Sequence, residues 1–137
     1  MAARIDAYVD TSALIAFCDR SDTYHLLFRR LFASPPSLVT TPLVVAEGHA
    51  WFLRRYDRQR ALQFTAMLEA MPFLQTVTTG PQELQPAFDL LRRFSDRALT
   101  LTDALGLHVM ALRGLRSCWS TDFHLGLTGV PLIIHEH

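Results

Sequence analysis

The chain has 137 residues, half of them hydrophobic and 19% charged, which fits a single domain with a packed core and excludes an intrinsically disordered chain. The 13 basic residues balance the 13 acidic ones, so bulk positive charge does not drive nucleic-acid binding, although a local basic groove is still allowed. No long apolar run is free of charge, and Asp6 and Asp10 interrupt the first one. We therefore expect no membrane span, no signal peptide and a cytoplasmic protein.

All of the basic residues are arginine, and the chain has only two cysteines. Arginine binds phosphate through a two-pronged planar contact, but the same bias also follows from the base composition of a genome. Cys18 and Cys118 are isolated from one another and from other metal-binding residues, so they form neither a zinc spacing nor a disulfide framework. We expect both to be buried free thiols.

The chain opens with a strand over residues 5–9 that ends on an acid. Asp10 follows this strand directly, and Thr11 or Ser12 can cap the apolar helix that comes next. Such a strand places its carboxylate at the carboxyl edge of a sheet, where ligands bind in open α/β folds. Asp10 also has an ordinary alternative role, because Asp is common at turns.

The next part of the chain alternates between helical and strand patterns. Residues 24–32 form an amphipathic helix that stops at a Ser-Pro-Pro-Ser stretch, and residues 38–40 form a short buried strand. A helix that begins at a Thr-Pro pair then covers residues 43–53 and carries Glu47 inside an apolar run. A charge in that place is paired, bound to a ligand or on the solvent side of the helix.

A helix over residues 59–70, a third strand over residues 73–77 and a helix over residues 82–94 follow. The helix after them is capped by Thr100 or Thr102 and holds Asp103 in its first turn, where the acid can also serve the helix dipole. Asp122 follows the next strand and can also be an ordinary helix cap. The elements that complete the chain are a strand, a short helix and an edge strand, over residues 117–120, 123–127 and 130–134.

Strands that alternate with helices predict an α/β fold with a mostly parallel sheet and helices on both faces. No internal repeat, low-complexity tract or linker divides the sequence. We therefore expect one domain over residues 1–137.

Four acids stand at comparable places, namely Asp10 and Asp122 after strands and Glu47 and Asp103 on early turns of helices. If they converge, like carboxylates repel one another, and a divalent cation relieves this repulsion. Ligands that are all oxygen select hard cations such as Mg²⁺ or Mn²⁺, and a bound water then loses its proton more easily. Such a site suits in-line attack on a phosphodiester.

The acids and their neighbours resemble the PIN-domain family and, within it, the VapC-type ribonuclease toxins of prokaryotic toxin–antitoxin pairs. The resemblance covers essentially the whole chain. It is carried by four ordered segments, which are Val9-Asp10-Thr11-Ser12, Thr41-Pro42-Leu43 to Ala46-Glu47, Leu101-Thr102-Asp103-Ala104-Leu105, and Ser120-Thr121-Asp122-Phe123-His124-Leu125 followed by Gly129.

This resemblance implies a PIN-like three-layer α/β/α fold with a mostly parallel central sheet, and a site made of Asp10, Glu47, Asp103 and Asp122. It also implies Mg²⁺ or Mn²⁺ as cofactor, endonucleolytic cleavage of RNA, a cognate antitoxin that blocks the site, and a homodimer. Side chains behind the site that can steady the ligands or the metal waters are Thr11, Ser12 and Thr121.

Two arginine clusters flank the acids along the chain. We expect them to line the RNA path or to receive an acidic antitoxin segment. They consist of Arg54, Arg55 and Arg58 after the Glu47 helix, and of Arg92, Arg93 and Arg97 before Asp103.

The main alternative is a degenerate PIN module that binds RNA or protein without cleaving. An aspartyl-phosphate phosphatase fits poorly, because position 12 is Ser where a second Asp is usual and the chain has no lysine. We expect His108 to pack within its helix. His124 either approaches RNA or lies on the surface.

Overall fold

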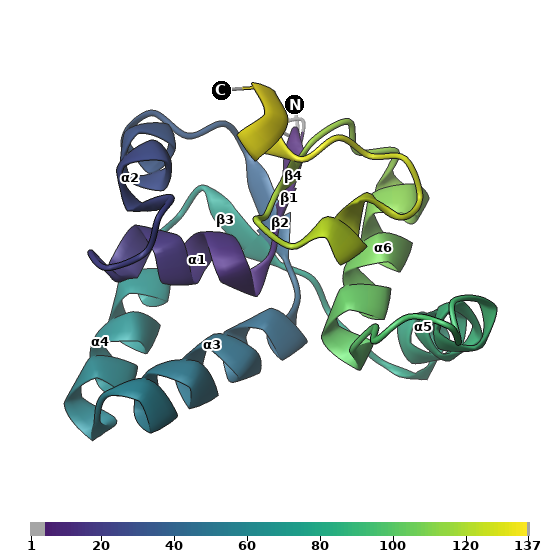
Figure 1. The fold of residues 1–137 in the computed structure, drawn as a ribbon, viewed down its shortest axis with the longest axis horizontal. Coiled ribbons are helices and arrows are strands. Elements are labelled where there is room, and N and C mark those ends of the chain that lie inside the picture. The colour runs from purple at the N-terminus through teal and green to yellow at the C-terminus, as the bar shows by residue number, and fades with distance from the viewer. Residues whose placement is uncertain (1–4, 137) are drawn as a thin grey trace.

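A four-stranded parallel sheet lies at the centre of this computed structural model, which describes residues 5–136 (Figure 1). The strand order is β3-β2-β1-β4, and each pair of neighbours is parallel. The strands are β1 (Ala7–Val9), β2 (Leu38–Thr40), β3 (Leu74–Thr76) and β4 (Cys118–Trp119). Because parallel strands end at the same edge, this order brings the residues after β1 and β4 together.

Helices cover both faces of the sheet, which confirms the predicted three-layer α/β/α fold. Figure 1 shows α1 and α2 on one side of the sheet and α5 and α6 on the other, while α3 and α4 pack together as a hairpin. The α-helices are α1 (Thr11–Cys18), α2 (His25–Ala33), α3 (Pro42–Arg55), α4 (Arg58–Glu69), α5 (Pro81–Arg93) and α6 (Leu101–Arg113). Two short 3₁₀ helices follow, η1 (Phe123–Gly126) and η2 (Ile133–Glu136).

The helices that carry site residues begin and end at residues suited to those positions. Thr41 caps α3 by accepting the N–H of Val44 at 3.3 Å, and Pro42 occupies the first turn, where its missing N–H costs nothing. Thr100 caps α6, and Gly114 ends it with φ at 61°, a left-handed conformation that glycine adopts without strain.

The central strand β1 is buried throughout, with each of its three residues at most 2% exposed. Two glycines let neighbouring elements approach very closely. A Cβ at Gly106 of α6 would lie 2.8 Å from the Tyr8 hydroxyl oxygen and 2.9 Å from the ring of Tyr8 in β1. A Cβ at Gly48 of α3 would overlap the ring of Phe64 in α4. These contacts fix α6 against the sheet and α4 against α3.

The predicted edge strand over residues 130–134 is wrong. Leu132 forms a single parallel bridge with Cys118, and η2 begins at the next residue. The carbonyl of Pro131 accepts the N–H of Cys118 at 3.0 Å, but a proline has no N–H of its own to extend a ladder. The short helix predicted at residues 123–127 is the 3₁₀ helix η1.

Both cysteines are free thiols, but only Cys118 is fully buried. Cys18 is half-buried, with its Sγ 3.0 Å from Sδ of Met67, so the prediction of burial was wrong for this residue. Over residues 5–136, no helix combines the length and the apolar character that crossing a membrane requires.

The close approach of α6 to β1 predicts the effect of adding one methyl group. We expect Gly106→Ala to destabilise the protein by about 1–3 kcal/mol, because overpacking a core has this cost. The gain in helix propensity, roughly 1 kcal/mol, does not cancel it. Urea unfolding measures the change. Gly126→Ala is the matched control, because a Cβ there meets no atom within 4 Å. Equal midpoints for the two variants would show that the contact is not tight.

Candidate active site

The candidate site lies where β1 and β4 end beside the first turns of α3 and α6. Asp10 directly follows β1, and its backbone N–H donates to the carbonyl of Trp119 at 3.0 Å, which ties the ends of the two strands together. Thr40 adds a second tie, because its hydroxyl donates to the carbonyl of Val9 at 2.7 Å. The sheet therefore fixes the position of Asp10 before any side chain of the site is considered.

The carboxylate of Asp10 is almost completely buried, at 3% exposure. Its Oδ2 accepts hydrogen bonds from the hydroxyls of Ser12 and Ser120, each at 3.0 Å. Its Oδ1 is buried and has no hydrogen-bond partner within the described part of the chain. Although Asp10 precedes α1, its side chain makes no capping hydrogen bond, so the alternative role of a helix cap is not the one observed.

Asp103 is also buried, at 4% exposure, in the first turn of α6. Its Oδ2 accepts the N–H of Thr100 at 3.1 Å, and its own N–H donates to Oγ1 of Thr100 at 3.1 Å. This reciprocal pair is a capping box. The helix-start role considered from the sequence is therefore real, and it holds the carboxylate at the sheet edge.

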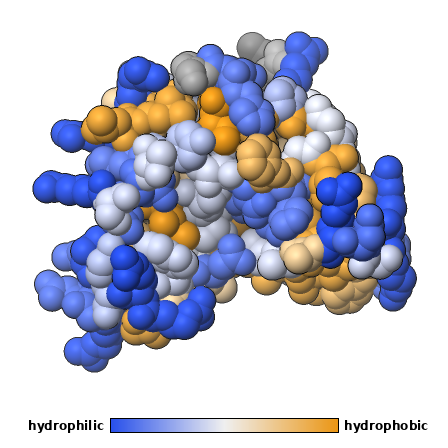
Figure 2. Space-filling model, viewed as in Figure 1, coloured by the Kyte–Doolittle hydropathy of each residue, from blue (hydrophilic) through white to orange (hydrophobic). Residues whose placement is uncertain are grey.

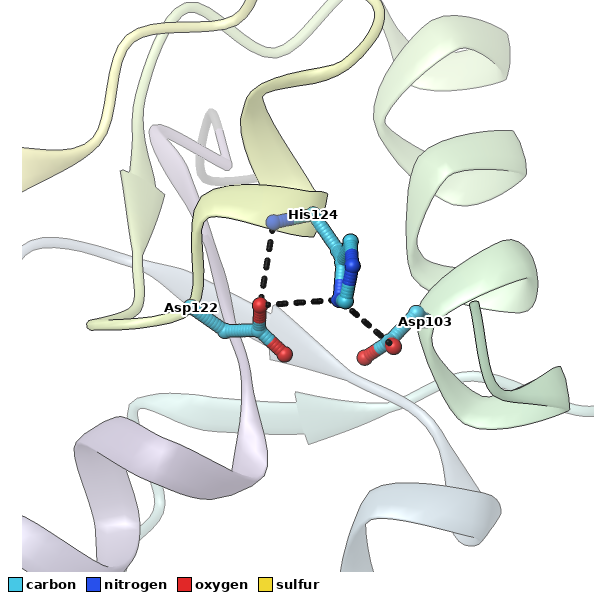
Figure 3. A group of neighbouring side chains, drawn as sticks. All are labelled: Asp103, Asp122 and His124. Carbon is cyan, nitrogen blue, oxygen red and sulfur yellow. Dashed lines mark hydrogen bonds and ion pairs between the residues drawn. The ribbon is translucent and has the colours of Figure 1, made fainter. Parts of the chain in front are cut away.

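Asp122 follows β4 and begins η1, where its Oδ1 accepts the N–H of His124 at 2.9 Å. The ring of His124 turns back toward two acids (Figure 3). Its Nδ1 lies 3.2 Å from Oδ1 of Asp122 and 3.8 Å from Oδ2 of Asp103. Asp103, Asp122 and His124 each offer one possible metal-ligand atom, and these three atoms all lie within 4.8 Å of one another. The sequence left His124 without an assigned role.

The electrostatics bring in Glu47 as well. Burial, followed by the charge of Asp103, raises the pKa of Asp10 to about 6. Burial raises the pKa of Asp103 too, and the charges of Asp122 and Glu47 add to this effect. Glu47 is half-buried on α3, and its charge acts on Asp103 across the site. Asp103 is therefore linked through charge to each of the other three predicted acids.

A network of hydroxyls lies behind the acids. Ser12 Oγ is 3.1 Å from Ser120 Oγ and accepts the N–H of Thr121 at 2.9 Å, while Ser120 Oγ accepts the N–H of Asp122 at 2.9 Å. Thr11 is buried, and its hydroxyl has no partner among the described residues. Ser120 is the member that the sequence interpretation missed. The signal for it was its position as the first residue after β4, two residues before an acid.

The arginines predicted to contact RNA or antitoxin are all exposed. Arg92 pairs with Asp89 at 2.8 Å and Arg97 with Asp96 at 3.7 Å, both on the surface. Arg54 and Arg55 end α3 and Arg58 begins α4, and these three form no ion pair within residues 5–136. Figure 2 shows hydrophilic side chains gathered between the two sides of the molecule, over the region of η1 and the start of α6.

These residues fit a divalent cation. Several carboxylates lie together in a partly buried place, neighbouring acids add to the rise in the pKa of Asp10 and of Asp103, and the buried Oδ1 of Asp10 lacks a donor among the described residues. A hard cation satisfies oxygen ligands of this kind and removes the repulsion between them. Asp10, Asp103 and Asp122 are the residues best placed to hold it, with Glu47 beside them.

The sequence model described as PIN domain matches residues 7–125, so the chain belongs to the PIN-domain family. Over 125 residues the chain is 30% identical to the 23S rRNA-specific endonuclease VapC20 of Mycobacterium tuberculosis, covering 89% of this chain and 93% of that protein. The relative is the same in two strains of that organism.

Solved structures show the same fold. The crystal structure of Mycobacterium tuberculosis VapC20, described as a sarcin–ricin loop cleaving toxin, has a TM-score of 0.84 at 24% identity, covering 92% of this chain and 97% of that one. A toxin–antitoxin complex from Klebsiella pneumoniae has a TM-score of 0.62 at 19% identity, covering 93% of this chain and 95% of that one. The predicted family, fold and enzyme class, an endoribonuclease of the VapC type, are confirmed.

The raised pKa of Asp10 predicts how stability depends on pH when metal is chelated. The folded pKa, about 6, lies above the unfolded value. The folded state therefore binds the extra proton between the two values, and the free energy of unfolding falls as pH rises through this window. A shift of about two pKa units corresponds to roughly 3 kcal/mol once the pH is above 7.

Asp10→Asn removes this charge. In EDTA we expect the variant to unfold at higher urea concentration than the wild type above pH 7, and the difference to shrink toward pH 4. Asp6→Asn is the control, because Asp6 is an exposed acid just before the same strand. A wild-type advantage that stays constant from pH 4 to 8 would contradict the assigned electrostatics.

Proposed function

We propose that this protein cleaves a loop of ribosomal RNA with the help of Mg²⁺ or Mn²⁺ held by Asp10, Asp103, Asp122 and Glu47. The observation that carries the proposal is a group of neighbouring acids, in which Asp103 and Asp122 lie close together and the nearby Asp10 has a buried carboxylate oxygen without a hydrogen-bond donor among the described residues. The RNA target is suggested by the relative that is 30% identical and is a 23S rRNA-specific endonuclease.

The cation supplies charge to stabilise the phosphate in the transition state and lowers the pKa of a bound water. The protein's own residues give the site its shape. Ser12 and Ser120 hold Oδ2 of Asp10, which leaves Oδ1 as the free ligand oxygen. Thr100 holds Oδ2 of Asp103 through its backbone N–H. With a cation bound by Asp10, Asp103, Asp122 and Glu47, these carboxylates would hold the ion that positions the phosphate, and a water would attack phosphorus in line with the P–O bond that breaks, its proton passing to solvent and the leaving oxygen taking one up.

A cognate antitoxin is the proposed protein partner, because a structural relative is a toxin–antitoxin complex. The arginines at the α3–α4 turn fit an acidic segment of such a partner, since no ion pair occupies them among residues 5–136. We also propose a homodimer and, from the ribosomal target, a cytoplasmic location.

Cleavage should require both the metal and Asp103. We expect pure protein to cut a sarcin–ricin loop RNA with Mg²⁺ or Mn²⁺ and to stop in EDTA. Asp103→Asn should abolish cutting, because the loss of one ligand charge is not replaced by any neighbour. Asp96→Asn is the matched control, since Asp96 lies seven residues earlier on the surface and forms only an exposed pair with Arg97.

Gel electrophoresis of end-labelled RNA measures the cut, and circular dichroism shows that each variant is folded. Undiminished cutting in EDTA would reject the metal mechanism. RNA that is bound but never cut, with either metal present, would favour the degenerate PIN module instead.

The two arginine clusters should differ in their contribution to RNA binding. Changing Arg92, Arg93 and Arg97 to Ala should weaken binding and reduce the slope of log K against log salt by about two for single-stranded RNA, because each phosphate contact contributes about 0.7. This cluster leads into α6 and its acid.

Changing Arg54, Arg55 and Arg58 should leave that slope nearly unaltered and instead weaken antitoxin binding. This cluster lies at the far end of α3 from its first turn. Filter binding over a salt series distinguishes the two sets. Equal slopes for both variants and the wild type would assign both clusters to ordinary surface.

A further inference from the structure

We propose that His124 contributes a ring nitrogen to the cation site and that this nitrogen makes the site prefer Mn²⁺ to Mg²⁺. The inference rests on the proposed function, because it concerns the same cation. It departs from the expectation of a site made only of oxygen ligands.

The distances around His124 suit shared coordination of one ion. Two ligands that each lie about 2.1 Å from an ion are roughly 3 Å apart when adjacent and about 4.2 Å apart when opposite. Nδ1 of His124 lies 3.2 Å from Oδ1 of Asp122 and 3.8 Å from Oδ2 of Asp103. The first separation is close to that of adjacent ligands and the second lies between the adjacent and opposite values, so both are compatible with one shared ion.

The orientation of the ring supports the same assignment. Figure 3 shows Nδ1 on the edge of the ring that faces both carboxylates. Nδ1 lies 3.2 Å from Oδ1 of Asp122, within ion-pairing distance, and that oxygen also accepts the backbone N–H of His124 at 2.9 Å. The η1 helix thus holds the ring in place through its backbone, with Nδ1 between the two carboxylates that would share an ion with it.

An independent observation points to a ligand at this place. Oδ1 of Asp10 is buried with no partner among the described residues, and Asp10 is 3% exposed. A buried acceptor without a donor is costly unless something binds it. Ser120 Oγ donates to Oδ2 of Asp10 and accepts the N–H of Asp122, so the carboxylate with the unsatisfied oxygen lies beside the group of Asp103, Asp122 and His124.

The nitrogen donor determines the choice of cation. Mg²⁺ binds oxygen ligands and water almost exclusively, whereas Mn²⁺, although it also favours oxygen, is a transition ion and accepts an imidazole more readily than Mg²⁺ does. Adding one imidazole to a carboxylate site therefore raises the affinity for Mn²⁺ more than the affinity for Mg²⁺. His124 consequently determines the preference between Mn²⁺ and Mg²⁺, whereas the four acids supply the negative charge that binds either ion.

Ion binding without RNA tests this assignment. The protein is titrated with Mn²⁺, and the loss of the free-ion signal in electron paramagnetic resonance gives the affinity for Mn²⁺. Competition with Mg²⁺ then gives the ratio of the Mn²⁺ affinity to the Mg²⁺ affinity. We expect the ratio of Mn²⁺ affinity to Mg²⁺ affinity to fall about tenfold in His124→Ala. The affinity for Mg²⁺ alone should change less. The size of the effect follows that of mutations in residues around metal ligands, which lower metal affinity about 10–100-fold. His124→Asn should behave in the same way and serves if the Ala variant does not fold.

His108→Ala is the matched control. His108 lies in α6, the helix that carries Asp103, but it lines a cavity with Leu90 and Arg93 of α5, and its replacement should leave the ratio unchanged. The wild type gives a direct readout as well, because pulsed resonance of bound Mn²⁺ detects coupling to a coordinated ring nitrogen. We expect this coupling in the wild type and in His108→Ala, and not in His124→Asn.

The outcomes separate this inference from the proposed function. Absence of nitrogen coupling in the wild type, or an unchanged affinity ratio in both His124 variants, would overturn the role of His124, even if RNA is still cut. Nitrogen coupling and a changed ratio in a protein that cuts no RNA would uphold the role of His124 and reject the nuclease.

Discussion

The burial of one carboxylate at the end of a central strand is the constraint on which the site depends. Asp10 cannot move toward water, because β1 is buried and its end is tied to β4 through the carbonyl of Trp119. Two serine hydroxyls satisfy one of its oxygens and leave the other bare. Burial of a charge in this way destabilises the fold unless a cation or a proton compensates it. The packed sheet tolerates this cost and thereby keeps the oxygen in position.

Asp103 and Asp122 are positioned by local hydrogen bonds that also shape the backbone. Asp103 is half of a capping box, and Asp122 caps η1. A carboxylate that caps a helix was considered from the sequence as an alternative to a site residue, but the two roles coincide here. The capping hydrogen bonds hold each side chain in one orientation, which is what a metal site requires of its ligands.

The fold could be predicted because each strand is an apolar run bounded by turn signals and each helix has an apolar face. Asp10, Asp103 and Asp122 could be proposed because each stands at an element's end, where parallel strands and the following helices meet, and Glu47 because it is a charge inside the apolar run of a helix. The failures have local causes. Residues 130–134 looked like a strand from their apolar side chains, but Pro131 and the start of η2 limit pairing to Leu132.

The contacts of Ser120 and His124 could not be predicted from the sequence, because both depend on how distant segments meet; for Ser120 the sequence offered only its position after β4. Ser120 reaches Asp10 across two neighbouring strands, a contact between residues far apart in the chain. The ring of His124 faces Asp103 only because η1 turns the chain back toward α6. A pattern of residue types contains no information about such turns, whereas the strand-end acids are specified by position alone.

Gly48 connects the site to a helix that supplies no acid to it. The residue follows Glu47 directly, and its missing side chain leaves room for the ring of Phe64, which is 2% exposed. The two positions therefore share one fixed volume. Any side chain at position 48 must be matched by a smaller one at position 64, or else the helix that carries Glu47 shifts. The size of the side chain at position 64 of α4 is in this way limited by the need to keep Glu47 of α3 in place.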